Sequence, residues 1–528
     1  MNNIGNYDVI VIGGGATGAG TARDCALRGL KVLLVERNDF ATGATGRNHG
    51  LLHSGARYAV TDIESATECI TENKILRSVA ADCIEDTQGL FITLPEDDLN
   101  YQERFIDSCI QAGISAQAIS PEEALRMEPS VNPSLIGAVK VPDGTIDPFR
   151  LVSANILDAR LHGAKILTYH KVVDFVRSGS RIEGVVLQDI LSGNRYAAYA
   201  PVTVNAAGIW GHLIAREAGV EIGMLPAKGS LLVFGHRVNN VVINRCRKPA
   251  DADILVPYDT VCLIGTTSDK IPFEDIDKNE VTTDDVDLLL SEGAKLAPAL
   301  ANTRILRAYS GVRPLVTDNI DHSGRSASHS IACLDHATRD GLEGFVTIAG
   351  GKLTTYRLMA ECITDMICRK LGKSLLCSTA TSPLPSTKAD KNNGSLRTKD
   401  KVFISKSKNN SALVCECKRV SVEDVKYAIN NLCATNLVDL RRRTRLGMGG
   451  CQSHFCAVRA AGVLTDNRTT TPQESLSDVA SFVNERWQGV RPIAWGNSLA
   501  GAQFTRWFYE GVCGLSEVAE TKQQEEKI

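Results

Sequence analysis

A glycine-rich turn near the N-terminus has the residue types and spacing of a dinucleotide-binding loop. Gly13, Gly15 and Gly18 match the pattern GxGxxG directly after the apolar run 8–12. The first glycine permits a tight turn, the second lets a pyrophosphate approach the backbone, and the third lets a helix pack on the strand. Glu36 ends the next apolar run, where a carboxylate accepts hydrogen bonds from ribose hydroxyls. The order of strand, turn, helix, strand and acid predicts a dinucleotide site.

Four cysteines near the C-terminus form a second pattern that could do chemistry. Cys415 and Cys417 make one close pair, and Cys451 and Cys456 make another. Two such pairs on separate loops suit either a zinc ion or a 2Fe–2S cluster, because thiolate sulfur binds both. His454 stands between the second pair, so the fourth ligand is either Cys456 or His454.

Three later segments favour FAD over NAD as the dinucleotide. Residues 171–204 have the alternation and the turns of a three-stranded meander. The meander leads into residues 203–208, where small side chains would let a second stretch of backbone approach the cofactor. Residues 344–352 form a strand that breaks into glycines before a helix, and the N-terminus of that helix would stabilise negative charge on a reduced flavin.

Length and composition limit the class of protein. The 528 residues exceed what one hydrophobic core usually holds, so two or three domains are expected. A net charge of −3 gives no reason to expect nucleic-acid binding. We find no apolar run of the ~18 residues that a membrane-spanning helix needs, and no signal peptide in the polar residues 1–7. We therefore expect a cytoplasmic chain whose cysteines stay reduced.

Three blocks, at 41–58, 309–315 and 350–356, resemble the signature sequences of FAD-dependent glycerol-3-phosphate dehydrogenases. With the earlier features, they make the chain similar to glutathione-reductase-like flavoproteins of the D-amino-acid oxidase group. The cysteine-bearing end resembles bacterioferritin-associated-ferredoxin-like domains, whose 2Fe–2S cluster lies between such cysteine pairs. The combination is similar to the catalytic A subunits of the bacterial anaerobic enzyme.

The resemblance implies an activity, which is the FAD-dependent oxidation of glycerol 3-phosphate to dihydroxyacetone phosphate. Electrons would leave through the cluster and two partner subunits, B and C, to a membrane quinone in anaerobic respiration. The chain would then lie in the cytoplasm, held at the inner face of the cell membrane by its partners. Two alternatives remain, namely a flavin enzyme for another hydroxy acid or an amine, and a redox-linked regulator.

The resemblance also implies residue roles. Arg57 and Arg313 would bind the substrate phosphate, since the guanidinium fork suits phosphate. Lys352 would hold the substrate hydroxyl or a flavin carbonyl. His53 is the expected base, because its ordinary pKa lies near the working pH, and His49 is the rival, placed beside the flavin. The remaining expected contacts are Tyr58 and Thr354 for the substrate, and Gly14, Arg37, Thr45, Gly50, Ala207, Gly208, Gly311, Gly350 and Gly351 for FAD.

Two further segments, around His329 and at 441–445, carry basic residues for which we also state expectations. Where family members carry an arginine after the 309–315 block, this chain has His329, which is mostly neutral at pH 7. Either a weaker hold on phosphate or replacement by Arg325 is expected. The arginines of 441–445, which precede the second cysteine pair, are expected to offset the negative charge of the cluster.

The expected fold is α/β. An FAD-binding Rossmann-like domain of the glutathione-reductase type is interleaved with a β-sheet substrate domain within residues 1–377. Residues 378–412 are expected to be a flexible linker, because they are rich in small polar residues and lysine. Residues 413–515 would form a small α-helical 2Fe–2S domain, followed by a tail at 516–528. Its aromatic stripe of Phe504, Trp507 and Phe508 is either buried core or a docking face for partner subunits.

Overall fold

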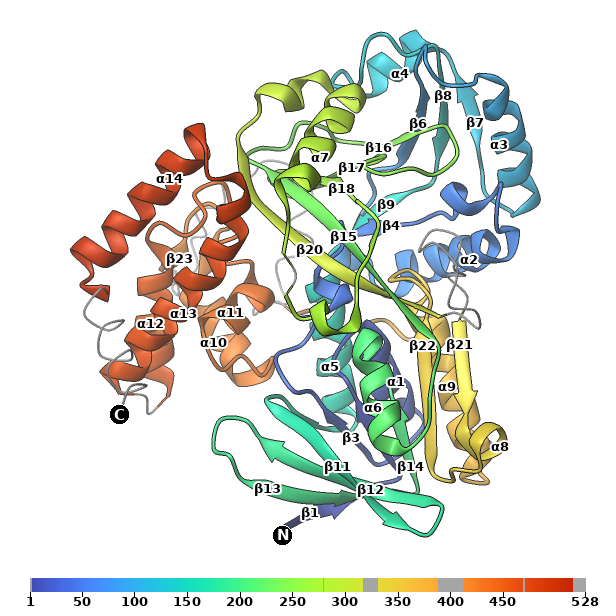
Figure 1. Cartoon of the computed structure of the whole chain (residues 1–528), viewed down its shortest axis with the longest axis vertical. Helices are drawn as coiled ribbons and strands as arrows, with labels where there is room; N and C mark the ends of the chain where they lie inside the picture. The colour runs from blue at the N-terminus through green and yellow to red at the C-terminus, as the bar shows by residue number, and fades with distance from the viewer. Residues whose placement is uncertain (1, 279, 317–330, 388–411, 469–470, 516–528) are drawn as a thin grey trace.

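A parallel sheet lies at the centre of the N-terminal part of the chain. The structure, a computed structural model, describes residues 2–278, 280–316, 331–387, 412–468 and 471–515 (Figure 1). The order of the six strands is β10-β3-β2-β14-β22-β21, and only the edge strand β21 is antiparallel to its neighbour. Their bounds are β2 Val9–Ile12, β3 Val32–Val35, β10 Lys165–Leu167, β14 Val202–Asn205, β21 Ile331–Asp335 and β22 Phe345–Gly350.

Different layers cover the two faces of this sheet, because successive side chains of a strand point to opposite faces. Val9 and Val11 pack in one core with three helices. Ile10 and Ile12 pack in another core against an antiparallel sheet. Burial of both faces explains the unbroken apolar runs that predicted these strands. The three helices are α1 Ala16–Leu27, α5 Pro148–Leu161 and α9 Tyr356–Lys370.

The antiparallel sheet contains the predicted meander. Strands β11, β12 and β13 pair in succession, and the chain then enters β14, as expected for residues 171–204. The polar N-terminal strand β1 was not expected, and it extends the sheet by pairing in parallel with β13. The bounds are β1 Asn2–Asn6, β11 His170–Ser178, β12 Arg181–Asp189 and β13 Arg195–Tyr199.

A larger sheet is built from two separate stretches of the chain, so it is interleaved with the dinucleotide fold as predicted. Its nine strands follow the order β19-β15-β18-β17-β16-β6-β8-β7, and β20 pairs with β15. The first stretch gives β6 Gly89–Thr93, β7 Gln117–Ile119 and β8 Gly137–Val141. The second gives β15 Met224–Phe234, β16 Val242–Arg245, β17 Ile254–Tyr258, β18 Val261–Gly265, β19 Asp269–Lys270 and β20 Ile305–Val316.

Helices and short strands complete the N-terminal part. Helix α7 packs on the larger sheet through Val286, Leu289 and Leu296. The helices are α2 Ile63–Val79, α3 Asn100–Gln111, α4 Pro121–Met127, α6 Gly211–Ala218, α7 Thr283–Leu296 and α8 His336–Asp340. A small three-stranded sheet joins β4 Leu51–Leu52, β5 Ile84–Glu85 and β9 Gly144–Ile146.

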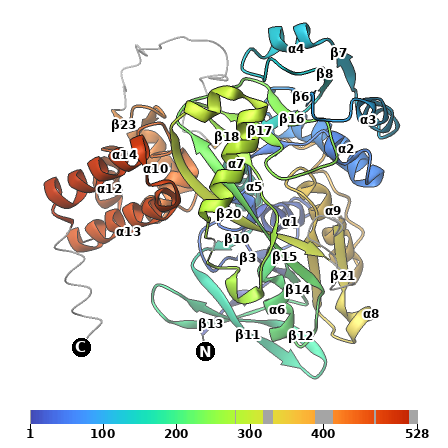
Figure 2. The same cartoon turned by 45° about the horizontal axis from the view of Figure 1, so that its top comes forward.

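The C-terminal domain is helical, as expected, and it lies beside β20 (Figures 1 and 2). A short hairpin of β23 Leu413–Cys415 and β24 Val420–Ser421 begins it. The helices are α10 Val422–Asn431, α11 Leu437–Thr444, α12 Cys456–Asn467, α13 Pro472–Val490 and α14 Gly496–Arg506, the last continuing into a π-helix at Trp507–Val512. Their apolar faces form a core of their own.

The expected linker is described only in part. Over residues 378–387 the chain contacts the N-terminal part: the carbonyl of Ser382 accepts a hydrogen bond from Arg23 at 2.8 Å, and the backbone N–H of Leu384 donates to Val79 at 2.7 Å. These first residues are therefore packed rather than free. Across the described residues we find no helix that combines the length and the apolarity needed to cross a membrane.

Candidate active site and cysteine module

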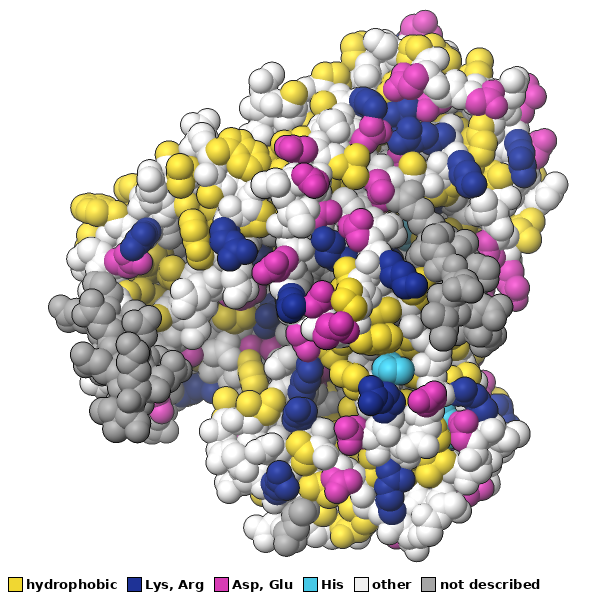
Figure 3. Space-filling view, viewed as in Figure 1, with side chains coloured by type: hydrophobic (Ala, Val, Ile, Leu, Met, Phe, Trp, Pro, Cys, Tyr) yellow, Lys and Arg dark blue, Asp and Glu magenta, His cyan; other side chains and the backbone are white. Residues whose placement is uncertain are grey.

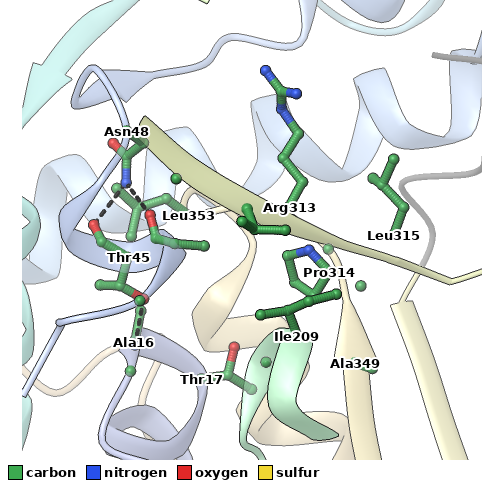
Figure 4. Close-up of a pocket in the computed structure, with 18 of the residues that line it drawn as sticks. Ala16, Thr17, Thr45, Asn48, Ile209, Arg313, Pro314, Leu315, Ala349 and Leu353 are labelled. Atoms are coloured by element: carbon green, nitrogen blue, oxygen red, sulfur yellow. Dashed lines mark hydrogen bonds between the residues drawn. The ribbon is translucent and has the colours of Figure 1, made fainter. Parts of the chain in front are cut away.

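A cavity of about 1520 Å³ joins the glycine loop to the larger sheet. The loop after β2 lines one part of it, and the strands β15 and β20 line another. Figure 4 shows the Arg313 side chain rising from β20 on the side away from Thr17 of helix α1. The cavity thus reaches from the parallel sheet, where a nucleotide would lie, to the larger sheet, where a small substrate would lie.

The glycine loop has the close contacts that its spacing predicts. Gly13 has a φ of +112°, and a Cβ there would lie 2.6 Å from the carbonyl oxygen of Ala206. A Cβ at Gly18 would lie 1.9 Å from the carbonyl oxygen of Gly13. Gly15 lines the cavity, where its lack of a side chain leaves the backbone open to a ligand. Each position therefore has a steric reason to be glycine.

Glu36 lies at the end of β3 and lines the cavity, as expected for a ribose acceptor. One carboxylate oxygen accepts from the backbone N–H of Gly14 at 2.7 Å, and the other accepts from Asn38 at 2.8 Å. Burial raises the pKa of Glu36, although these backbone donors oppose the effect. The hydrogen bonds hold the carboxylate at the cavity wall.

The loop after β3 closes over the start of α1. The hydroxyl of Thr45 accepts from the backbone N–H of Ala16 at 3.0 Å (Figure 4). The side-chain amide of Asn48 donates to the carbonyls of Ala44 and Thr45, at 3.2 and 2.7 Å. The loop therefore presents a fixed backbone surface, and residues 42–45 of it line the cavity.

Arg57 and Arg313 reach the same part of the cavity from different elements. Arg57 donates to the carbonyl of Ala250 at 3.0 Å and lies 3.4 Å from the carboxylate of Asp253. Arg313 donates to the hydroxyl of Ser268 at 3.3 Å and also to the hydroxyl of Thr266. These contacts fix the two guanidinium groups where an anion could bind them.

The two candidate bases are neighbours. The ring centroids of His49 and His53 are 6.1 Å apart, and His53 lies 5.4 Å from Tyr58. Burial lowers the pKa of His49 to about 3, and the charges of Arg57 and Arg313 act in the same direction. His49 is therefore neutral at physiological pH.

Lys352 carries a buried charge that the described residues leave without a hydrogen-bond acceptor. Its Nζ is buried, has no hydrogen-bond partner there, and lies 4.5 Å from the ring centroid of Tyr58. A buried ammonium without a hydrogen-bond acceptor is costly, and an oxygen of a bound ligand would supply the acceptor. Lys352 lines the cavity, and its unused hydrogen-bonding capacity fits an oxygen of a flavin or a substrate.

Most of the expected site residues line this cavity, and four of them do not. Thr354 is buried, and its hydroxyl accepts from the backbone N–H of His53 at 3.2 Å, so it supports His53 instead of reaching the cavity. Gly14, Gly18 and Gly50 also lie outside the lining. The lining includes Gly13, Gly15, Glu36, Arg37, Thr45, His49, His53, Arg57, Tyr58, Ala207, Gly208, Gly311, Arg313, Gly350, Gly351 and Lys352.

Sequence reasoning missed polar residues that the larger sheet brings to the cavity. Lys248, Thr266 and Ser268 line it, and the two hydroxyls position Arg313. None of them belongs to a recognisable motif, since loops of a separate sheet carry them. His329 and Arg325, the expected departures at the phosphate site, lie outside the described residues.

The four cysteines form a chain of sulfur contacts. Sγ of Cys417 lies 3.7 Å from Sγ of Cys415 and 3.6 Å from Sγ of Cys451. Cys456 lies close enough to Cys415 for the two thiols to affect each other's pKa, and its Sγ is 3.3 Å from the hydroxyl oxygen of Ser453. The ring of His454 instead packs 5.1 Å from the ring of Phe504. This arrangement favours Cys456 over His454 as the fourth ligand.

The sulfur contacts do not decide between zinc and a 2Fe–2S cluster, because thiolates that share one zinc ion and thiolates that share one iron lie at similar distances.

The arginines of 441–445 do not serve the cysteines, contrary to expectation. Arg443 and Arg442 pair with Asp39, Arg441 pairs with Glu485, and Arg445 pairs with Asp147. Two of these three acids belong to the N-terminal part. The cationic charge therefore joins the two domains and does not offset a cluster.

The fold and the site define a flavin-dependent oxidoreductase joined to an iron–sulfur domain. Residues 8–357 match the family described as FAD dependent oxidoreductase, and residues 413–466 match the BFD-like 2Fe-2S binding domain. The second match spans all four cysteines. The chain therefore binds FAD and a 2Fe–2S cluster. The family match favours the cluster over the zinc ion that the cysteine spacing also allowed.

Known proteins narrow the class. The A subunit of the anaerobic glycerol-3-phosphate dehydrogenase of Escherichia coli is 58% identical over 527 residues, covering 97% of each chain. The corresponding protein from Haemophilus influenzae, which has the same name, is 55% identical, covering 98% of this chain and 95% of that one. The A1 subunit of Haloferax volcanii is 40% identical, covering 93% and 88%. The chain belongs to this family of A subunits.

Solved structures agree on the fold. The glycerol-3-phosphate dehydrogenase of Bacillus halodurans, complexed with FAD, has a TM-score of 0.66 at 21% identity and covers 93% of this chain and 97% of its own. The glycine oxidase of Geobacillus kaustophilus has a TM-score of 0.57 at 22% identity, covering 72% and 98%. At these identities the likeness concerns the fold alone.

Proposed function

We propose that this chain oxidises glycerol 3-phosphate to dihydroxyacetone phosphate and passes the electrons, by way of its iron–sulfur domain, to B and C subunits and a membrane quinone. The observation that carries the proposal is the meeting of Arg57, Arg313 and Lys352 at one end of the FAD cavity. Two guanidinium groups suit a phosphate dianion, and the ammonium suits a hydroxyl or carbonyl oxygen. The names of the A subunits support the same substrate.

Each side chain then has a distinct task. Arg57 and Arg313 bind the phosphate, and Nζ of Lys352 donates to the oxygen on carbon 2 of the substrate. A ring nitrogen of His53 accepts the proton of that hydroxyl as the carbonyl forms. FAD, when bound, supplies the acceptor for the hydride of carbon 2. His49 stays neutral, because burial disfavours its charged form and the nearby charges of Arg57 and Arg313 add to that effect.

A flavin enzyme for an amine or another hydroxy acid is the second candidate. It is supported by the shared fold of the glycine oxidase. Its substrate would present a carboxylate to the arginines in place of a phosphate. A carboxylate carries one negative charge, whereas a phosphate monoester carries nearly two at pH 7, so the paired arginines favour the phosphate.

The partner subunits have a suitable surface on the C-terminal domain. Phe504 and Trp507 are exposed on α14 and the π-helix, whereas Phe508 packs against the helical core, so the buried-core interpretation holds for Phe508 alone. Their rings lie 6.3 Å apart, and exposed Phe455, next to Cys456, lies 5.0 Å from Phe508. Figure 3 shows apolar side chains over this domain. An exposed aromatic patch beside the cysteines fits the docking of an electron-accepting partner, which would hold the chain at the inner face of the membrane.

An anaerobic titration of the purified protein tests the substrate. Glycerol 3-phosphate should bleach the flavin absorbance stoichiometrically, whereas lactate, glycine and proline should leave it unchanged. Bleaching by one of these acids and not by glycerol 3-phosphate would favour the second candidate. Bleaching by none of the compounds would favour a redox-linked regulator.

A further inference from the structure

The arginines of helix α11, and Arg445 directly after it, contact the N-terminal domain next to the loop that lines the FAD cavity. Arg443 forms a bidentate ion pair with Asp39, with Nη1 3.0 Å from one carboxylate oxygen and Nη2 close to the other. Arg442 adds a third bond at 2.9 Å. Asp39 is 1% exposed, and it lies three residues after Glu36 of the dinucleotide site. Burial alone would raise the pKa of Asp39, but the two guanidinium charges outweigh it and lower that pKa.

Arg443 and Arg445 also lie over aromatic rings that pack against the FAD-binding backbone. The guanidinium of Arg443 lies 5.0 Å from the ring centroid of Phe40. Phe40 packs directly on the glycine loop, since a Cβ at Gly14 would lie 2.8 Å from its ring. Arg445 repeats the arrangement two residues later, 4.7 Å from the ring of Phe149.

Phe149 braces the other end of the same loop. A Cβ at Gly46 would lie 2.6 Å from the Phe149 ring, and Arg445 is also hydrogen-bonded to Asp147 at 2.9 Å. Between these two supports lie residues 42–45, which line the cavity, with Thr45 hydrogen-bonded to the start of α1. Each end of the loop is thus held by an arginine of the C-terminal domain, acting through an aromatic ring.

These ion pairs are shielded from water. Arg443 and Arg445 are each 6% exposed, and a buried charge that loses its partner destabilises its surroundings strongly. A guanidinium held on both its carboxylate and its ring has little freedom to move. The contact is therefore a rigid support for the loop.

We propose that Arg443 and Arg445 are positioning residues for FAD, acting from the iron–sulfur domain on the loop 39–46, so that tight FAD binding requires this domain to be docked. Neither side chain lines the cavity, and the proposal does not depend on which substrate the enzyme oxidises. It predicts that FAD affinity falls when the docking contact is broken, even with the glycine loop and Glu36 intact.

The test is the dissociation constant for FAD, measured by flavin fluorescence on full-length protein stripped of flavin, with no substrate present. Arg443→Ala should raise this constant by about 5- to 150-fold, the usual range of coupling between sites. Arg443→Lys should recover only part of the affinity, since an ammonium lacks the bidentate fork. Arg459→Ala is the matched control, because Arg459 pairs with Glu416 on the exposed side of the same domain.

A second variant covers failure of the first to fold. Asp39→Asn with Arg443→Met removes both charges of the bidentate pair, and Arg442 keeps Asp439, 3.8 Å away, as its carboxylate partner. It should fold, bind FAD more weakly, and show faster amide hydrogen exchange over residues 41–47. Wild-type FAD affinity in a folded Arg443→Ala or in the double variant would overturn the proposal. An equal loss of affinity in Arg459→Ala would overturn it as well, since the effect would then not be specific to the contact.

Discussion

Positive charge is concentrated around a few residues at the substrate end of the cavity. Arg57 and Arg313 stand close enough to His49 to lower its pKa, in addition to the effect of burial. Lys352 adds a third cation with no hydrogen-bond acceptor among the described residues. Asp253 offsets part of this charge through Arg57, and a multiply charged anion would offset the remainder.

The phosphate role of Arg313 can be tested by its removal. Arg313→Ala should lower kcat/KM for glycerol 3-phosphate by about 10- to 150-fold, since a hydrogen bond to a charged group contributes about 1.5–3 kcal/mol. The measurement is steady-state reduction of a small dye by the FAD-loaded enzyme. Arg339→Ala serves as control, because that side chain is exposed on α8. Unchanged constants in Arg313→Ala would remove Arg313 from the phosphate site.

Replacing Lys352 should affect stability and activity in opposite directions. Lys352→Met keeps the shape of the side chain and removes a buried charge that lacks a hydrogen-bond acceptor. The FAD-free variant should melt no lower than wild type, and about 2–4 °C higher for each 1 kcal/mol of relieved strain in a domain of ~150–250 residues. Dye reduction should fall at least ~10-fold in the same preparation. A clear loss of melting temperature would show that Lys352 is paired in the folded protein.

His49 should make the stability of the protein depend on pH. Its pKa falls from 6.5 to about 3 on folding, so below pH 6.5 the unfolded chain binds a proton that the folded chain does not. The contribution is fully present above pH 6.5 and is lost as the pH falls toward 3, with a slope of up to about 1.4 kcal/mol per pH unit. Urea unfolding at several pH values should show a shallower slope for His49→Gln than for wild type. Parallel slopes would contradict the buried, neutral state.

At the scale of elements, helix α1 crosses the end of β2 at very close range, with Gly18 at the contact. Gly18→Ala would place a Cβ 1.9 Å from a backbone oxygen, so the helix has to move away from the strand. We expect loss of FAD binding and lower stability, measured by flavin content and thermal melting. Gly462→Ala is the opposite case, because its Cβ meets nothing within 4 Å inside α12. The free energy of unfolding of Gly462→Ala should rise by up to about 1 kcal/mol, because alanine has the higher helix propensity. Equal stability and equal flavin content of the two variants would contradict the packing argument.

How much of this could be predicted from the sequence depends on how local each signal is. The strand from Val9, the glycine loop and Glu36 follow one another within one unit, so their order alone predicted the dinucleotide fold. The meander and the two cysteine pairs could be predicted for the same reason, since the residues that form each pattern lie close together in the sequence. The hydroxyls of Thr266 and Ser268 were not predicted, because only the folding of a second sheet brings them to Arg313.

The arginine run shows why a local interpretation can fail. Its position before the cysteines suggested a role beside the cluster, yet α11 points it toward Asp39 and Asp147. These acids lie hundreds of residues earlier in the chain, and nothing in their neighbourhood marks them as partners. Only the packing of α11 against α5 brings the charges together.

The whole molecule is more tightly joined than a flexible linker suggests. Lys418, which follows the exposed Cys417, pairs with Asp259 at 2.7 Å in the turn between β17 and β18. Tyr169 donates a hydrogen bond to Asp439 of α11 at 2.7 Å. The cysteine module therefore has a fixed place beside the flavoprotein, in spite of the long polar segment that connects them.

The route of the electrons is the last test, and it concerns the whole complex. Cys415→Ser should abolish the cluster, because a 2Fe–2S centre needs all four thiolates. With FAD supplied in excess, the variant should still reduce a small dye with glycerol 3-phosphate, since no residue of the cavity has changed. Quinone-linked activity in the assembled complex should collapse.

Both activities are to be measured with iron and sulfide content in one preparation. Cys513→Ser is the matched control, a thiol of the same domain outside the cysteine cluster. The Cys513→Ser variant should keep its iron and should still reduce both the dye and the quinone, because Cys513 is not one of the four cysteines that we expect to bind the cluster. If Cys415→Ser loses its iron and still reduces quinone in the complex, the electrons leave the flavin by another path and the iron–sulfur domain has only its structural role.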